Sequence, residues 1–214
     1  DQASLACVEE YLHLGLPPWA RALLLIEVDG EGEAVTRQGQ TIELVCRRVG
    51  AGRITTAATA EEAEALWKAR KAISPALFRL KPHKINEDIV VPRLMIPEAI
   101  RRFQEIGRNL DLTLVTFGHA GDGNLHVNIM YDGRQTSESR RAGQAVSEIF
   151  RVVLELGGTL SGEHGIGLTK AHYLPWELDP VSLSLMKKIK DLFDPQGILN
   201  PGKIFSEAPS SDRI

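Results

Sequence analysis

The sequence predicts an α+β fold in which helices cover a mostly antiparallel sheet. Segments with strand and helix patterns are mixed along the chain, without the regular alternation of a doubly wound fold. Two apolar runs, 112–117 and 125–130, flank the turn sequence Asp122-Gly123, which is typical of an antiparallel hairpin. With 214 residues and 43% hydrophobic content, the chain is long enough to bury a substantial core.

The N-terminal part combines an expected helix with an expected strand. We expect a helix over 5–14. The apolar, partly β-branched run 22–30 ends in Asp-Gly, which predicts a buried strand leading into a turn. Residues 31–41 are expected to form a loop, whereas 42–48 fits either a strand or an amphipathic helix.

Capping signals mark the next helix. Thr59 and Glu62 have the spacing of a capping box, in which each side chain accepts a backbone N–H. The following helix carries Arg70 and Ser74 one turn apart on one face, and Pro75 interrupts its hydrogen-bond ladder.

Three further helices are expected downstream. Pro97 suits the first turn of a helix that ends near residue 110, and a longer helix is expected over 137–156. Asp179-Pro180 caps a last helix that ends at Asp194, and the polar tail 207–214 is expected to fray. The residues expected to face the core are Ala145, Ile149, Val152, Val153 and Leu156 in the longer helix, and Leu185, Met186, Ile189, Leu192 and Phe193 in the last one.

Composition excludes several classes of partner. The chain has 25 Lys and Arg against 28 Asp and Glu, a net charge of −3, and no long run of either sign, so no nucleic-acid partner is expected. The longest apolar run, 22–26, is far shorter than the roughly 20 residues of a membrane span. Cys7 and Cys46 lack metal-ligand spacing, which predicts free thiols and therefore a cytoplasmic protein. Any attachment to a membrane is expected to be through a partner protein.

The predicted hairpin contains two histidines. With Asp122-Gly123 at its tip, His119 lies opposite His126. Opposed Cβ atoms lie about 4.5–5.5 Å apart, which suits two imidazoles that bind one divalent ion. Asn128 points to the same face as His126. Two surface histidines on a glycine-rich hairpin are the alternative, because histidine spacing alone is weak evidence.

A second polar segment follows the longer helix. Glu163 and His164 lie between glycines there, and one carboxylate added to two histidines makes a ligand set with open positions, as in catalytic metal sites. On an extended backbone, neighbouring side chains point to opposite faces, so one of the two is expected to be a ligand and the other a base. The alternative is an exposed polar loop.

Three long motifs carry a family resemblance. They are GHAGDGNLHVN at 118–128, SGEHGIG at 161–167 and DPQGILNPGK at 194–203. From about Trp67 to Phe205, the chain resembles the C-terminal, substrate-binding region of FAD-dependent 2-hydroxy-acid dehydrogenases of the vanillyl-alcohol-oxidase superfamily. That group includes glycolate oxidase D subunits, D-lactate dehydrogenases and D-2-hydroxyglutarate dehydrogenases.

The resemblance implies that residues 1–214 form the cap domain of an FAD-linked oxidase. FAD would be bound mainly by an N-terminal domain of the same polypeptide that this chain lacks, in agreement with the absence of a glycine-rich nucleotide fingerprint. The implied reaction is oxidation of a small D-2-hydroxy acid, of the lactate or glycolate type, to the 2-oxo acid. The isolated chain should be inactive, and the electron acceptor is left open.

Matched motif by motif, the resemblance implies a divalent metal site and a base. His119, His126 and Glu163 would bind zinc, manganese or iron, all of which accept such ligands. The metal would bind the substrate's carboxylate and hydroxyl oxygens, His164 would take the hydroxyl proton, and a hydride would leave to the flavin.

The resemblance also implies substrate and flavin contacts. Arg70 would grip the substrate carboxylate, with Ser74 and Asn128 as pocket residues. Asn200 would lie near the flavin, its alternative being a simple Asn-Pro turn. Members that use dicarboxylates have a lysine two residues before an aspartate, whereas Asn86 precedes Asp88 at that spacing and Lys84 lies further back, which argues against a second substrate carboxylate. His13, His83 and His172 are expected to be surface or packing residues.

Two other function classes fit the ligand set alone. One is a metal-dependent hydrolase that activates water, and the other is a noncatalytic binding module with a vestigial site. The oxidoreductase is preferred because it accounts for three separated motifs, whereas each alternative accounts only for the metal ligands.

Overall fold

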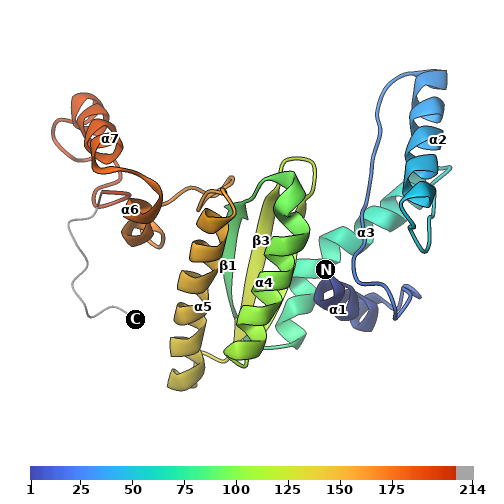
Figure 1. Ribbon diagram of the computed structural model, residues 1–214, viewed down its shortest axis with the longest axis horizontal. Coiled ribbons are helices and arrows are strands. Elements are labelled where there is room, and N and C mark those ends of the chain that lie inside the picture. The colour runs from blue at the N-terminus through green and yellow to red at the C-terminus, as the bar shows by residue number, and fades with distance from the viewer. Residues whose placement is uncertain (206–214) are drawn as a thin grey trace. The chain divides into compact units, whose positions relative to one another are not determined.

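The structure describes residues 1–205. They include a three-stranded antiparallel sheet with the strand order β1-β3-β2 (Figure 1). In this computed structural model β1 is His83–Val90, β2 is Thr113–His119 and β3 is Asn124–Tyr131. The α+β prediction is confirmed, and the tail expected to fray lies outside the described residues. The chain divides into two units, Asp1–Leu80 and Lys81–Ile214, with the sheet in the second.

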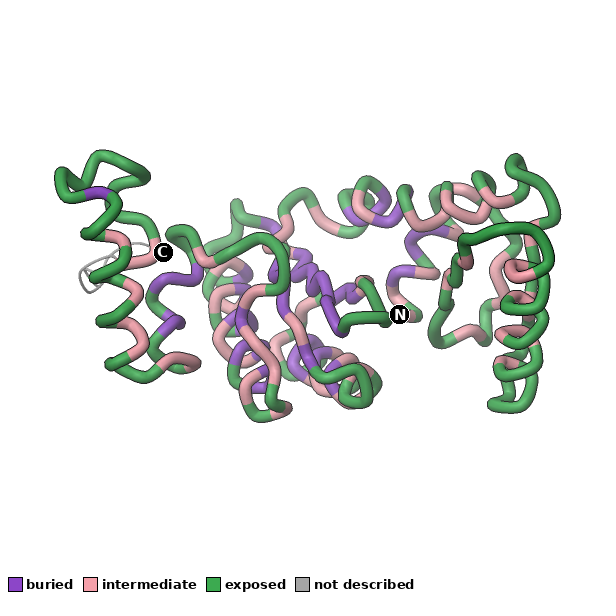
Figure 2. The backbone as a smooth tube through the Cα atoms, turned by 90° about the horizontal axis from the view of Figure 1, so that it is seen from above, coloured by how far each residue is buried: buried purple, intermediate pink, exposed green. Residues whose placement is uncertain are grey.

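Two helices cover one face of the sheet. They are α4, Ile96–Asn109, and α5, Thr136–Glu155, which lie side by side over the strands in Figure 1. Because strand residues alternate between faces, every second residue joins this core, and the strands appear as buried segments in Figure 2. Each large apolar side chain buried here contributes about 1.5–3 kcal/mol. The main core residues are Ile89, Val127 and Ile129 from the strands, Phe103 from α4, and Ile149, Phe150 and Val153 from α5.

The first unit is helical throughout its regular elements. It contains α1, Gln2–Leu12, α2, Gly32–Arg48, α3, Ala60–Ala76, and the short 3-10 helix η1, Leu77–Arg79. Helix α1 packs against α3. The predicted N-cap is confirmed, because the Thr59 hydroxyl accepts the N–H of Glu62 at 3.3 Å. The Glu62 carboxylate accepts the N–H of Ala58 at 2.7 Å, one residue before the N–H that a capping box uses.

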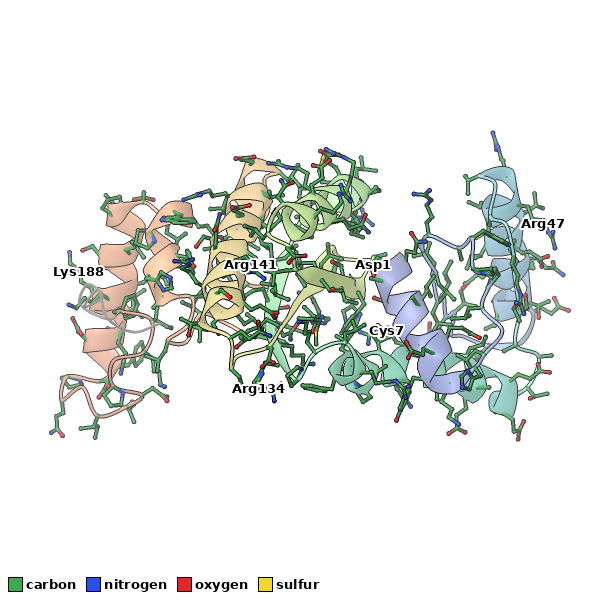
Figure 3. All side chains as sticks on the ribbon, turned by 90° about the horizontal axis from the view of Figure 1, so that it is seen from below. Asp1, Cys7, Arg47, Arg134, Arg141 and Lys188 are labelled. Atoms are coloured by element: carbon green, nitrogen blue, oxygen red, sulfur yellow. The ribbon has the colours of Figure 1, made fainter. Side chains whose placement is uncertain are left out.

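Two predictions for this unit are wrong. The run 22–30 forms no strand, and Leu24 is 69% exposed, because no described strand pairs with its backbone groups. The expected loop 31–41 and the ambiguous segment 42–48 instead form α2, where good helix formers outweigh the cost of Gly39. Arg47 in the last turn of α2, labelled in Figure 3, forms an ion pair with Glu43 at 2.6 Å.

The last part of the described chain contains two short 3-10 helices and two helices. These are η2, Arg93–Met95, η3, Ala171–Tyr173, α6, Leu174–Glu177, and α7, Pro180–Phe193. Asp179 caps α7 as predicted, accepting the N–H groups of Val181 and Ser182 at 2.8 and 3.0 Å.

The apolar face of α7 is exposed. Leu185 is 58% exposed and Leu192 is 76% exposed, so the prediction that this face belongs to the core is wrong. An amphipathic pattern shows that a face is suited to burial, but it does not specify the surface that covers it. None of the described helices is long and apolar enough to cross a membrane. Cys7 and Cys46 are both free thiols.

Candidate metal centre

The hairpin differs from its predicted register by two residues. His126 lies opposite Phe117, and His119 lies opposite Asn124. The strands are joined by the loop 120–123 rather than by a two-residue turn, and the Asp122 carboxylate accepts the N–H of Asn124 at 3.0 Å. The side chain of Asp122 thus lengthens the turn, a possibility that the Asp-Gly signal alone does not reveal.

The two histidines nevertheless meet. Side chains alternate along a strand, so a displacement of two residues leaves every side chain on its predicted face. The rings of His119 and His126 are edge to face, with centroids 5.8 Å apart, as diagonal neighbours. Asn128 lies on the same face, opposite Asn86, and Asp88 lies opposite His126. The two rings are therefore neighbours, but the predicted opposed pairing is wrong, and the convergence of both imidazoles on one ion stays a prediction.

A buried aspartate anchors the second polar segment to the sheet. Asp88 in β1 is fully buried, and its Oδ2 accepts the N–H groups of Gly162, Glu163 and His164 at 2.9, 2.8 and 2.9 Å. The Asn124 amide donates to Oδ1 at 2.7 Å. Only glycine fits at 162, because a Cβ there would lie 1.7 Å from Nδ2 of Asn124.

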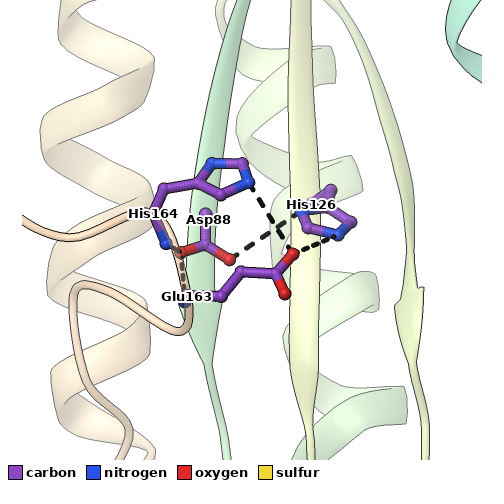
Figure 4. A group of neighbouring side chains, drawn as sticks. All are labelled: Asp88, His126, Glu163 and His164. Carbon is purple, nitrogen blue, oxygen red and sulfur yellow. Dashed lines mark hydrogen bonds and ion pairs between the residues drawn. The ribbon is translucent and has the colours of Figure 1, made fainter.

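The backbone of residues 162–164 curves around the Asp88 carboxylate and brings the side chains of Glu163 and His164 next to His126. The carboxylate oxygen Oε1 of Glu163 lies 3.5 Å from Nε2 of His126 and 3.7 Å from Nε2 of His164 (Figure 4). The expectation that the two neighbours point to opposite faces is wrong, because it assumed an extended backbone, whereas three successive N–H groups here wrap around one carboxylate. The His126 and His164 rings are stacked 5.5 Å apart.

The resulting cluster has a buried floor, formed by Asp88 and His126, and an open side, formed by the exposed residues Glu163 and His164. Among the described residues, Asp88, His126, Glu163 and His164 each offer one ligand atom, and these atoms lie within 4.8 Å of one another. The side chains of Glu163 and His164 are 58% and 48% exposed, whereas that of His126 is 9% exposed. His119 is outside this group of four, although its ring is adjacent to His126.

The distances fit a divalent ion. Nitrogen and oxygen ligands at about 2.0–2.2 Å from a zinc ion lie roughly 3–4 Å from one another, which matches the separations at Glu163. Three buried polar atoms on this face, Oδ1 of Asn124, Nδ1 of His126 and Oδ1 of Asn128, have no hydrogen-bond partner among the described residues. Such atoms are costly unless a further group satisfies them.

Electrostatics favour the ligand forms of both buried residues. Burial alone would raise the pKa of Asp88, but the hydrogen bonds from the backbone of His164 and from Asn124 outweigh it and hold the pKa well below the usual range. Burial lowers the pKa of His126, against the opposing attraction of the Asp88 and Glu163 charges. An ionised carboxylate therefore lies beside a neutral imidazole.

A buried lysine, Lys170, contacts the backbone of Asp88 and of the residues before Glu163. The amine of Lys170 donates to the backbone oxygens of Asp88 and Leu160 at 2.6 and 2.7 Å, and lies 3.6 Å from the carboxylate of Glu87. Burial lowers the pKa of the Lys170 amine and raises the pKa of the Glu87 carboxyl. Lys170 thus joins β1 to the segment that carries Glu163.

Sequence reasoning missed Asp88 and Lys170 as parts of the site. In the sequence analysis Asp88 served only to show that a lysine is absent two residues before it. An acidic residue directly before the apolar residues 89–91 is unusual, and this pattern could have indicated a buried polar site. Lys170 carries no such signal, because lysines in loops are usually solvated.

The other predicted site residues lie elsewhere. Arg70 and Ser74 lie on α3 of the first unit, separated by one turn as predicted. Asn200 follows α7, and its backbone is left-handed, with φ 47°. The residues before it are held by Asp194, whose carboxylate accepts the N–H groups of Ile198 and Leu199 at 3.0 and 2.9 Å. The roles of Arg70, Ser74 and Asn200 stay predictions.

The remaining histidines have surroundings of their own. Nδ1 of His83 accepts the N–H of Gly133 at 3.0 Å, and the ring of His172 lies 3.8 Å from that of Tyr173. His13 ends α1 in a left-handed conformation.

Comparisons with known proteins cover nearly the whole chain. A model of the family described as FAD linked oxidases, C-terminal domain, matches residues 1–204. The glycolate oxidase subunit GlcD of Bacillus subtilis (strain 168) is 46% identical over 207 residues, which are 97% of this chain and 44% of that protein. D-2-hydroxyglutarate dehydrogenase of Stutzerimonas stutzeri (strain A1501) is 38% identical over 150 residues, which are 68% of this chain and 32% of that protein.

A solved structure shares the fold. The crystal structure of p-cresol methylhydroxylase with substrate bound matches 84% of this chain and 37% of that one, with a TM-score of 0.65 and 18% identity. This likeness concerns the fold alone. The chain spans less than half the length of these relatives.

Proposed function

This chain belongs to the FAD linked oxidases, C-terminal domain, family, and from this we propose that it is the substrate- and metal-binding half of an FAD-dependent dehydrogenase. The proposed reaction is oxidation of a small D-2-hydroxy acid, of the lactate or glycolate type, to the 2-oxo acid. The observation that carries the proposal is the convergence of Glu163 and His164 on His126, at the open side of a buried polar floor.

In this proposal His119, His126 and Glu163 hold a divalent ion, such as zinc, manganese or iron. The donor set suits these ions, and Nε2 of His126 lies 3.5 Å from the Glu163 carboxylate, a separation that fits two ligands of one ion. A bound divalent ion would supply the positive charge that lowers the pKa of the substrate hydroxyl, and FAD, held mainly by the rest of the polypeptide, would supply the hydride acceptor.

His164 is the proposed base. Its half-exposed side chain can reach a substrate, and its Nε2 lies beside the Glu163 carboxylate, whose negative charge would stabilise the imidazolium formed when Nε2 takes the hydroxyl proton. The order of roles thus stays as expected from the motif, with Glu163 as ligand and His164 as base, even though both side chains share one side of the loop.

Arg70, Ser74 and Asn128 are the proposed substrate-binding residues, and Asn200 is the proposed flavin contact. The Arg70 guanidinium is suited to a planar carboxylate, with Ser74 beside it on α3. Asn128 contributes a buried amide oxygen that has no hydrogen-bond partner in residues 1–205. Asn200, at the left-handed turn after α7, is proposed to lie near the flavin.

The substrate is proposed to carry a single carboxylate. Asn86, which lies opposite Asn128 in the sheet, offers no positive charge to a second one. The higher identity to a protein named glycolate oxidase subunit than to one named D-2-hydroxyglutarate dehydrogenase supports the smaller acid. Family membership does not favour a metal-dependent hydrolase or a noncatalytic module, the two alternatives that the ligand set alone allowed.

Flavin bleaching tests the proposal. The full-length protein that contains this chain, loaded with FAD and metal, is mixed anaerobically with glycolate and with the D and L forms of lactate and 2-hydroxyglutarate. Bleaching by D-lactate or glycolate is expected, with little by D-2-hydroxyglutarate.

A His164→Asn variant should bleach about 10²–10⁴-fold more slowly, whereas His172→Asn, at an exposed histidine, should resemble the unmodified protein. No bleaching by any 2-hydroxy acid would overturn the proposed function.

A further inference from the structure

We propose that Asp88 is a positioning residue of the metal centre rather than a ligand, acting through His126 and through the loop 162–164. The inference rests on the metal centre of the proposed function. Although Asp88 lies within ligand range of the other three groups, the way its two oxygens are used assigns it a different task.

The carboxylate of Asp88 has almost no capacity left for an ion. A carboxylate offers about four lone-pair sites. Three backbone N–H groups occupy Oδ2, and the Asn124 amide occupies Oδ1. The remaining direction of Oδ1 faces Nδ1 of His126 at 3.8 Å. A metal would have to displace one of these donors, and the displaced donor would be left buried.

His126 is placed between Asp88 and the open side. Its Nδ1 faces the buried carboxylate and has no other partner, whereas its Nε2 faces Glu163. A neutral imidazole carries its proton on one nitrogen only. With an ion between Nε2 and the Glu163 carboxylate, that proton is on Nδ1, where the buried negative charge of Asp88, 3.8 Å away, stabilises it.

The same carboxylate shapes the loop. The three N–H groups that it accepts belong to consecutive residues, which include both Glu163 and His164. Without the negative charge at Oδ2, these N–H groups would lose their common acceptor, and the curl that brings both side chains to His126 would lose its anchor. One buried charge thus sets the ligand atom of His126 and the positions of Glu163 and His164.

A neighbouring carboxylate provides a matched control. Glu87 is on the same strand and is 6% exposed, but it points to the opposite face, toward Lys170. Glu87→Gln removes a buried acidic group from β1 but leaves the Asp88 carboxylate and its hydrogen bonds to the loop 162–164 in place. A purely structural effect of losing buried charge should therefore appear in both variants.

Zinc affinity is measured by competition with a chromophoric chelator, on the full-length, FAD-loaded protein. Asp88→Asn should bind zinc about 10–100-fold more weakly than the unmodified protein, Glu163→Gln should bind it more weakly still, and Glu87→Gln should keep the original affinity. An unchanged affinity in Asp88→Asn, or an equal loss in Glu87→Gln, would overturn the inference. A loss in Asp88→Asn as large as that in Glu163→Gln would make Asp88 a ligand and overturn it too.

A second measurement does not depend on the folding of a variant. In the unmodified, zinc-loaded protein with 15N-labelled histidine rings, NMR should find the proton of His126 on Nδ1 and the metal on Nε2. A proton on Nε2 would overturn the inference. If the flavin is bleached by hydroxy acids while these results fail, the inference alone fails. If zinc binding follows the expected pattern but no hydroxy acid bleaches the flavin, the proposed function fails instead.

Discussion

Asp88 and Gly162 show how much of the site depends on close fit at single positions. The loop approaches β1 so closely that a methyl group on Gly162 would overlap the Asn124 amide, which in turn donates to Asp88. The sequence marks the segment as glycine-rich, but it does not reveal which glycine requires the close approach. Only the folded contact distinguishes Gly162 from glycines that have open space around them.

A pair of alanine substitutions tests this close fit. Gly162→Ala should lower the free energy of unfolding by about 1–3 kcal/mol, because the added methyl group forces Asn124 and the loop apart. Gly121→Ala is the control, since nothing lies within 4 Å of the Cβ it would add. The free energy of unfolding of both variants is measured by urea denaturation, and equal values for the two would contradict the close approach of the loop to β1.

At the scale of elements, the sequence predicted helices better than strands. The side chains of Thr59 and Asp179 cap helices through local hydrogen bonds, and Pro97 fits the first turn of α4 because its backbone N–H is not needed there. The run 22–30 has the local pattern of a strand, but a strand also needs a partner, which is not encoded locally. The predicted hairpin register was wrong for a different reason, because the strands are joined by the four residues 120–123, within which Asp122 accepts the N–H of Asn124, and not by a two-residue turn.

The cap of α7 gives a prediction with a pH dependence. Hydrogen bonds from Ser182 and from the backbone of Val181 lower the pKa of Asp179. A carboxyl whose pKa is lower in the folded state stabilises above its ordinary pKa of about 4 and loses that contribution as the pH falls through the folded value.

Asp179→Ala should therefore speed amide hydrogen exchange in the first turn of α7 at neutral pH, and the difference from the unmodified protein should shrink below about pH 4. A difference that persists undiminished in acid would show that the ionised cap is not responsible.

Lys170 connects two elements, and its removal should be costly. Lys170→Met leaves the buried carboxylate of Glu87 without its cation and removes the donor shared by Asp88 and Leu160. The expected loss in unfolding free energy is about 3–5 kcal/mol. Lys187→Met, at an exposed position of α7, is the control and should change it little. Thermal unfolding that treats the two variants alike would contradict a connecting role.

At the scale of the whole molecule, the chain carries a polar centre and an apolar face that nothing among residues 1–205 covers. The apolar core lies between one face of the sheet and the helices α4 and α5, which cover it. Helix α7, by contrast, exposes residues such as Leu185 and Ile189. The sequence predicted the composition of this face but not its surroundings, because amphipathicity specifies what should be buried and not by what.

The family motifs predicted more of the site than physical patterns alone could. Local spacing placed His119 and His126 on one face, and strand alternation preserved that result despite the wrong register. The approach of Glu163 to His126 depends on contacts between segments far apart in the chain, which no local pattern encodes. The motif resemblance supplied it as an expectation, and the buried carboxylate of Asp88 provides the physical reason.

The most direct test of the proposed centre is the rate of flavin reduction as a function of metal content. The full-length enzyme is stripped with a chelator, reduced anaerobically with D-lactate or glycolate, and measured again after zinc, manganese or iron is restored. Loss of the metal should slow reduction at least about 100-fold, and restoration should recover it. Glu163→Gln should stay slow after metal is added. Reduction at the normal rate in metal-free protein would contradict the account.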